Sequence, residues 1–82
     1  MTSAELADTL SRMHHRAADG DKAVMVHLFG IRYADEIRHC GASVAEIVRL
    51  SALSHTTYAT EVSKGVKLAR YVSLRSDCDF GM

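Results

Sequence analysis

Apolar residues recur at helical spacing along most of the chain, beginning within residues 2–17. Successive apolar positions there lie four, three and four residues apart, which predicts an amphipathic helix. The residues in this series are Leu6, Leu10, Met13 and Ala17. Thr2 and Glu5 have the spacing of an N-terminal capping box, and we expect the helix to end near Gly20.

Residues 22–39 contain more apolar side chains than one narrow helix face accommodates, which predicts a central helix covered on several sides. Residues 24–29 are also typical of a short strand, because they are rich in β-branched and aromatic side chains and precede Gly30. We favour a helix because the 3.6-residue period continues through Gly30 to Tyr33 and Ile37. A glycine inside a helix costs only about 1 kcal/mol.

Residues 43–65 predict two short helices joined by a tight corner. Ser43 and Glu46 repeat the capping-box spacing ahead of an apolar face formed by Ile47, Val48 and Leu50. The corner is Ser51-Ala52-Leu53-Ser54, where the small Ala52 allows two helices to cross at about 90–120° and Leu53 fills the space beneath. In the second helix, Ser54 is the N-cap, Tyr58 and Val62 share the inner face, and Gly65 offers a left-handed C′ position.

This segment resembles the DNA-binding headpiece of the lac-repressor family, whose helix-turn-helix opens with a Thr or Ser cap and runs through a K-L-A-G-V-S turn. The same register here is Arg49-Leu50-Ser51-Ala52-Leu53-Ser54, followed by His55-Thr56-Thr57-Tyr58. The chain departs from the family in three places. Ala52 stands where the family has a corner glycine, Thr60 where it has a recognition-helix arginine, and Glu61 where it has a late apolar residue. We expect Val62 to replace Glu61 as the core contact. More loosely, the whole chain is similar to small bacterial helix-turn-helix-like proteins.

The resemblance implies that the second helix enters the major groove of double-stranded DNA with its N-terminal residues at the base edges. Candidate base contacts are His55, Thr56, Ala59 and Thr60, since threonine and histidine hydrogen-bond bases and alanine permits close approach. Candidate phosphate contacts are Ser43, Ser54, Thr57, Lys64, Lys67 and Arg70. The alternative for each of these residues is an ordinary solvated surface.

The charge of the chain divides unevenly around this motif. The formal net charge is zero, with ten basic and ten acidic residues, which argues against a nucleic-acid partner because phosphate contacts supply most non-specific affinity. However, residues 1–42 carry five basic and six acidic side chains, whereas residues 43–76 carry five basic and two acidic ones. Positive charge therefore accompanies the motif.

Metal, cofactor and catalytic sites are not predicted. His14-His15 and His39-Cys40 are adjacent pairs whose side chains diverge by about 100° on a helix, and no H-x-x-x-H or C-x-x-C pair occurs. No nucleophile elbow or phosphate-binding glycine loop is present, so we do not expect an enzyme. Cys40 and Cys78 are expected to be reduced thiols, and without a signal segment or a long apolar run we expect a cytoplasmic protein with no membrane partner.

The sequence thus predicts one all-α domain over residues 1–82, a four-helix unit in which residues 1–42 support a helix-turn-helix at 43–65. Residues 66–82 form a C-terminal extension, with 66–74 either helical or an edge strand and the last residues mobile. We expect a DNA-binding transcriptional regulator or DNA-recognition subunit, acting as a homodimer because two copies can read half-sites one helical turn apart. The alternative is a helical interaction adaptor, or a small subunit of a larger complex, without DNA affinity.

Overall fold

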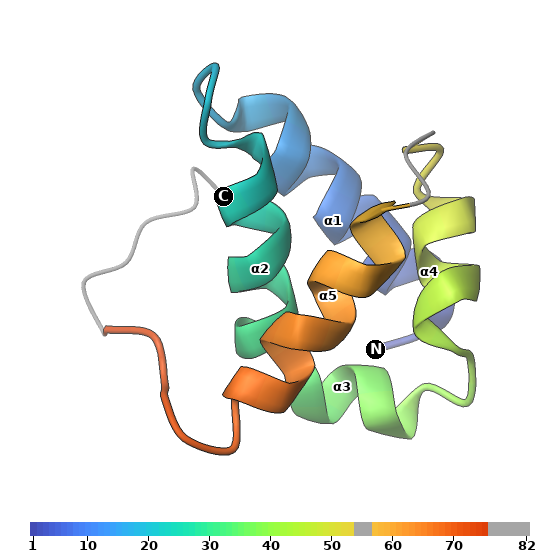
Figure 1. Ribbon diagram of the computed structural model, residues 1–82. Helices are drawn as coiled ribbons and strands as arrows, with labels where there is room; N and C mark the ends of the chain where they lie inside the picture. The colour runs from blue at the N-terminus through green and yellow to red at the C-terminus, as the bar shows by residue number, and fades with distance from the viewer. Residues whose placement is uncertain (54–56, 76–82) are drawn as a thin grey trace.

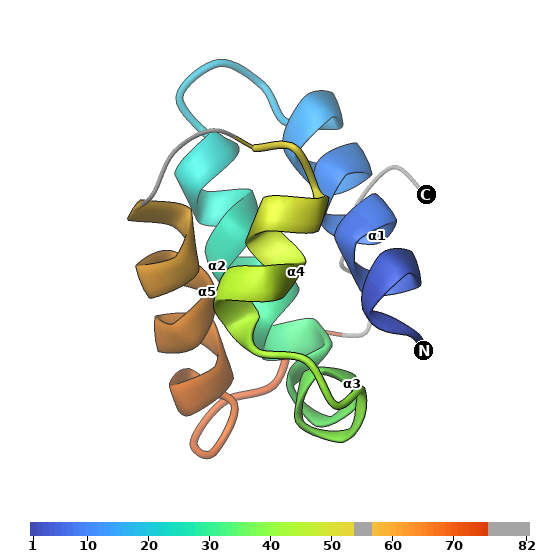
Figure 2. The ribbon, with the colours of Figure 1, turned by 90° about the vertical axis from the view of Figure 1, so that its right-hand side faces the viewer.

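The computed structural model describes residues 1–53 and 57–75, and these ranges contain helices and their connections without any strand. The helices are α1 (Ser3–Arg16), α2 (Lys22–Arg32), α3 (Ala34–His39), α4 (Val44–Leu50) and α5 (Thr57–Leu68). Helix α3 closes one end of the bundle, α4 packs mainly against α1, and α5 packs mainly against α2 (Figure 1, Figure 2). The all-α prediction is confirmed.

Helix α1 begins with the predicted capping box. The Thr2 hydroxyl accepts a hydrogen bond from the Glu5 backbone N–H at 3.1 Å, and the Glu5 carboxylate accepts one from the Thr2 backbone N–H at 2.8 Å. The backbone bond from Thr2 is the main reason that the pKa of Glu5 lies below its ordinary value. Two N–H groups that lack helical partners are thereby satisfied, and the first turn of α1 is fixed.

The single helix predicted over residues 22–39 is wrong, because the chain divides at Tyr33 into α2 and α3 and the described residues therefore form five helices rather than four. Tyr33 has φ −110° and ψ 23°, outside helical geometry, and is both the C-cap of α2 and the N-cap of α3. The break changes the direction of the chain, so that Ala34 and Ile37 reach the core from the end of the bundle. A straight helix would have carried them past it.

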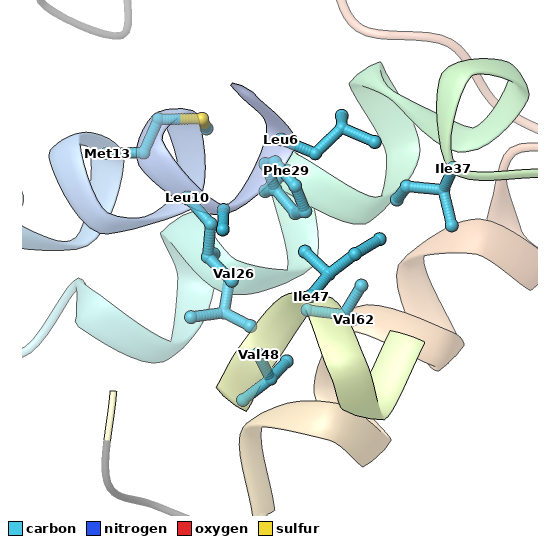
Figure 3. Close-up of a cluster of buried hydrophobic side chains, with 10 residues drawn as sticks. Leu6, Leu10, Met13, Val26, Phe29, Ile37, Ile47, Val48 and Val62 are labelled. Atoms are coloured by element: carbon cyan, nitrogen blue, oxygen red, sulfur yellow. The ribbon is translucent and has the colours of Figure 1, made fainter. Parts of the chain in front are cut away.

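All five helices contribute to one hydrophobic core (Figure 3). Phe29 of α2 lies among α1 side chains, with Val62 of α5 and Ile47 of α4 on the opposite side, and all three are completely buried. Burying a side chain of this size contributes about 1.5–3 kcal/mol. The remaining buried members of the cluster are Leu6, Ala7, Leu10, Met13, Val26, Ile37 and Val48.

Helices α2 and α5 cross in backbone contact at Gly30 and Gly65. A Cβ atom on Gly65 would lie 2.9 Å from the Gly30 Cα and closer still to the His27 carbonyl oxygen. A Cβ on Gly30 would similarly lie 3.0 Å from the Gly65 Cα and closer to the Val62 carbonyl oxygen. Neither glycine can therefore acquire a side chain unless the helices separate.

The prediction that Gly65 ends the second helix of the motif is wrong, since α5 continues through Gly65 to Leu68. Gly65 allows α5 to pack closely against α2 and does not end the helix. Beyond α5, the N–H groups of Tyr71 and Val72 donate to the Leu68 carbonyl oxygen at 2.9 and 3.0 Å, forming a final turn. Residues 66–74, for which both a helix and an edge strand were predicted as alternatives, thus form the end of α5, a turn and irregular chain.

Replacing Gly65 with alanine should destabilise the protein by about 2 kcal/mol, because the overpacking penalty exceeds the roughly 1 kcal/mol that alanine gains in helix propensity. Urea unfolding followed by circular dichroism measures the change. Thr60→Ala, on the exposed face of the same helix, is the matched control and should change stability by no more than about 0.5 kcal/mol. Equal stability of the two variants would contradict the close crossing.

Candidate nucleic-acid interface

Ser51 fixes the turn that follows α4. Its backbone N–H donates to the Ile47 carbonyl oxygen at 3.0 Å, and its buried hydroxyl donates to the Val48 carbonyl oxygen at 2.6 Å. The same hydroxyl accepts a bond from the Leu53 N–H at 3.4 Å. Leu53 packs against the core beneath the turn, as the sequence predicts. The hydroxyl thus both donates and accepts within the turn, which satisfies a buried polar group.

Ala52 lies at the corner in a left-handed conformation, with φ +62° and an exposed side chain. We expected a small residue here to let two helices cross closely. The close crossing in the structure is instead between α2 and α5, at Gly30 and Gly65, and the constraint at Ala52 comes from its own backbone, which has a positive φ. A left-handed conformation costs a residue with a side chain roughly 1–2 kcal/mol.

The predicted capping box at the start of α4 forms only in part. Ser43 Oγ accepts a hydrogen bond from the Glu46 N–H at 3.1 Å. The Glu46 carboxylate instead pairs with Arg49, whose Nε lies 3.2 Å from Oε2. The hydrogen bond from Arg49 is the main reason that the pKa of Glu46 lies below its ordinary value, and the same pair raises the pKa of Arg49. Arg49 is thus partly neutralised at the motif.

Helix α5 has one face in the core and the opposite face in solvent. Val62 and Gly65 are buried, and Tyr58 on the same side forms a hydrogen bond between its hydroxyl and His14 Nε2 at 2.9 Å. Val62 is the core contact and Glu61 is not, as we expected; the Glu61 carboxylate pairs with His27 of α2 and lies 3.4 Å from Lys64 Nζ. Hydrogen bonds and apolar contacts therefore fix the rotation of α5 about its axis.

The solvent face of α5 carries several predicted DNA contacts in one stripe. The exposed residues on this stripe are Thr57, Thr60, Lys64 and Lys67. Positions three and four apart share a helix face, so the stripe runs along α5 directly opposite Val62. Ala59 is not part of it, because its side chain is half-buried and packs against the core. That position disfavours the base contact proposed for Ala59.

The other predicted contacts lie around this stripe. Arg70 is exposed in the turn beyond α5, and Ser43 is exposed at the start of α4. Ser54, His55 and Thr56 fall outside the described residues.

Two surface hollows border the C-terminal half of α5, and Lys67 lines both. One, of about 310 Å³, is almost wholly apolar in lining and is formed by Lys64, Lys67, Leu68 and Tyr71. The other, of about 270 Å³, lies between α3, α4 and α5 and is formed by Arg38, Val44, Ser63, Val66, Lys67 and Arg70. Sequence reasoning missed Arg38, which belongs to a helix outside the predicted motif.

Among the residues that the structure describes, no three histidine, cysteine, aspartate or glutamate side chains are grouped so that they could hold a metal ion. None of the helices formed by residues 1–53 and 57–75 has the length and apolar character needed to cross a membrane.

Helices α4 and α5, joined through a left-handed corner and supported by α1 and α2, define a helix-turn-helix type of domain. A family model of the HTH-like domain matches residues 2–75. The chain belongs to this family, and the match shows that the supporting helices are part of the family's unit. Neither a curated protein nor a solved structure matches the chain significantly.

Replacing Ala52 with glycine should raise the free energy of unfolding by up to about 1 kcal/mol, because glycine adopts a positive φ without the steric penalty. Ala52→Val should lower it by at least as much, since β-branched residues tolerate this region least. Chemical denaturation measures both changes. A valine variant as stable as the glycine variant would rule out the left-handed corner.

Proposed function

We propose that the protein binds double-stranded DNA by placing α5 in the major groove. The observation that carries this proposal is the exposed stripe of Thr57, Thr60, Lys64 and Lys67 on the side of α5 opposite its buried face. An α-helix is about 10–12 Å in diameter and the major groove about 12 Å wide, so a helix exposed in this way fits the groove.

The order of side chains along the stripe suits this placement. Thr60 lies in the first half of α5 and would reach base edges together with His55 and Thr56, which precede the helix in sequence. Lys64 and Lys67 lie in the second half, roughly 6–10 Å farther along the axis, where they would meet phosphates. Threonine specifies a base less sharply than a bidentate arginine or asparagine does, so intrinsic specificity is modest.

We infer a transcriptional regulator or DNA-recognition subunit in the cytoplasm, without catalytic activity, similar to the lac-repressor-family headpiece at residues 43–65. A homodimer follows from the modest specificity of one short helix, because two copies would read two half-sites. The corner supports the likeness, since Ala52 has a backbone conformation that glycine adopts most readily.

A second candidate is a protein-interaction adaptor without DNA affinity. It is favoured by the exposed apolar residues beyond and at the end of α5, where Tyr71 is 82% exposed and Leu68 and Val72 are also accessible. The apolar hollow beside Lys64 lies in the same region. Zero net charge also suits this alternative, because long-range attraction to DNA is then weak.

Binding to a random-sequence duplex should weaken steeply as salt rises, with a slope of about −0.9 in log–log form for each phosphate contacted. Lys64→Glu and Lys67→Glu should each lower affinity about tenfold or more at low salt. Fluorescence anisotropy of a labelled duplex measures both effects. Arg12→Glu, an exposed α1 residue paired with Asp8, is the matched control and should bind as the unmodified protein does.

If micromolar protein leaves the random duplex unbound at low salt, DNA binding is refuted and the adaptor proposal is favoured. If Arg12→Glu weakens binding as much as Lys67→Glu does, the stripe on α5 is not the binding surface.

Sequencing of duplexes retained from a random pool should yield two half-sites about 10–10.5 base pairs apart, as a homodimer requires. Thr60→Ala should lose preference for the selected duplex over a random one by about 1–3 kcal/mol while retaining most non-specific affinity. Competition binding measures this preference. An unchanged preference would remove Thr60 from the base contacts.

A further inference from the structure

The hollow between α3, α4 and α5 brings Arg38, which was not among the predicted DNA contacts, together with two residues that were. Arg38 of α3, Lys67 of α5 and Arg70 beyond α5 are three of its six lining residues. Ser63 adds a hydroxyl, and the remaining surface is apolar. Three cationic side chains gathered around one hollow repel one another, and an anion placed among them would relieve that repulsion.

The guanidinium group of Arg38 makes one contact with α5 and one within its own helix, α3. Nη2 donates to the Val66 carbonyl oxygen at 3.5 Å, and Nη1 donates to Asp35 Oδ1 at 3.1 Å. Asp35 has a side chain that is 79% exposed, so solvent screens this ion pair strongly. A guanidinium group has five N–H donors in a fixed plane, which leaves Arg38 able to bind a further acceptor.

Among the residues that the structure describes, Lys67 and Arg70 have no acidic partner comparable to Asp35 beside Arg38. Within residues 1–53 and 57–75, neither of these two side chains forms an ion pair. By contrast, Lys64 on the outward stripe lies near Glu61, and Arg49 is paired with Glu46. Within the described part of the chain, the two basic side chains near α5 that form no ion pair, Lys67 and Arg70, therefore both line the hollow.

We propose that Arg38, Lys67 and Arg70 together bind one phosphate of the DNA backbone on the flank of α5. This inference rests on the proposed DNA-binding function and adds α3 to the binding surface. A helix that lies in the major groove has a sugar-phosphate backbone on each side, and the hollow lies on the α3–α4 side of α5, next to the outward stripe. Val44 and Val66 offer an apolar surface for the carbon atoms of the deoxyribose.

The test compares salt dependence of binding to a random duplex between the unmodified protein and Arg38→Gln. Loss of one phosphate contact should reduce the magnitude of the log–log slope by about 0.9 and lower affinity by a similar factor on every duplex sequence. Asp35→Asn should strengthen binding a few-fold, because it removes the carboxylate that competes for Arg38. Arg12→Gln, which breaks another exposed arginine–aspartate pair, on α1, should change neither quantity.

The outcomes separate this inference from the function on which it rests. A slope unchanged by Arg38→Gln, with binding still weakened by Lys64→Glu, would overturn the phosphate site and leave DNA binding intact. No binding by the unmodified protein would overturn both. If Arg38→Gln fails to fold, NMR of the unmodified protein provides the test. The Arg38 Nε–H signal should shift when a short duplex is added. A signal that does not move would overturn the phosphate site.

Discussion

The contact between Gly30 and Gly65 determines where α5 can lie, and the candidate interface depends on that position. With no Cβ on either residue, the two helix backbones touch, and Val62 is carried into the centre of the core. Because Thr60 and Lys64 lie on the side of α5 opposite Val62, burial of Val62 leaves both of them exposed to solvent. The packing of α5 against α2, more than the corner after α4, therefore presents the stripe.

Several elements were predictable because their causes are local in sequence. The capping box at Thr2 and the apolar series that starts at Leu6 involve residues three or four apart. The capping box forms, and Leu6, Leu10 and Met13 are buried, although α1 ends at Arg16 and Ala17 is its C-cap. That Val62, and not Glu61, makes the core contact also followed from helical spacing. The stripe containing Lys64 was predictable for the same reason, as the complement of the buried face.

Other features could not be predicted because they depend on residues distant in sequence. Gly65 has the appearance of a helix terminator until Gly30, thirty-five positions earlier, is known to face it. The break at Tyr33 likewise depends on distant residues, because it lets Ile37 pack in a core formed with the other helices. Arg38 lies on the helix that begins after that break, and periodicity alone did not place it at the basic hollow.

The short length of α3 links ligand binding to folding. A six-residue helix does not persist by itself in water, so α3 keeps its place through the burial of Ala34 and Ile37. Arg38 lies on this same helix and also bonds to the α5 backbone. A ligand that binds Arg38 together with a residue of α5 would therefore hold α3 against the bundle, and by mass action it would favour the folded chain.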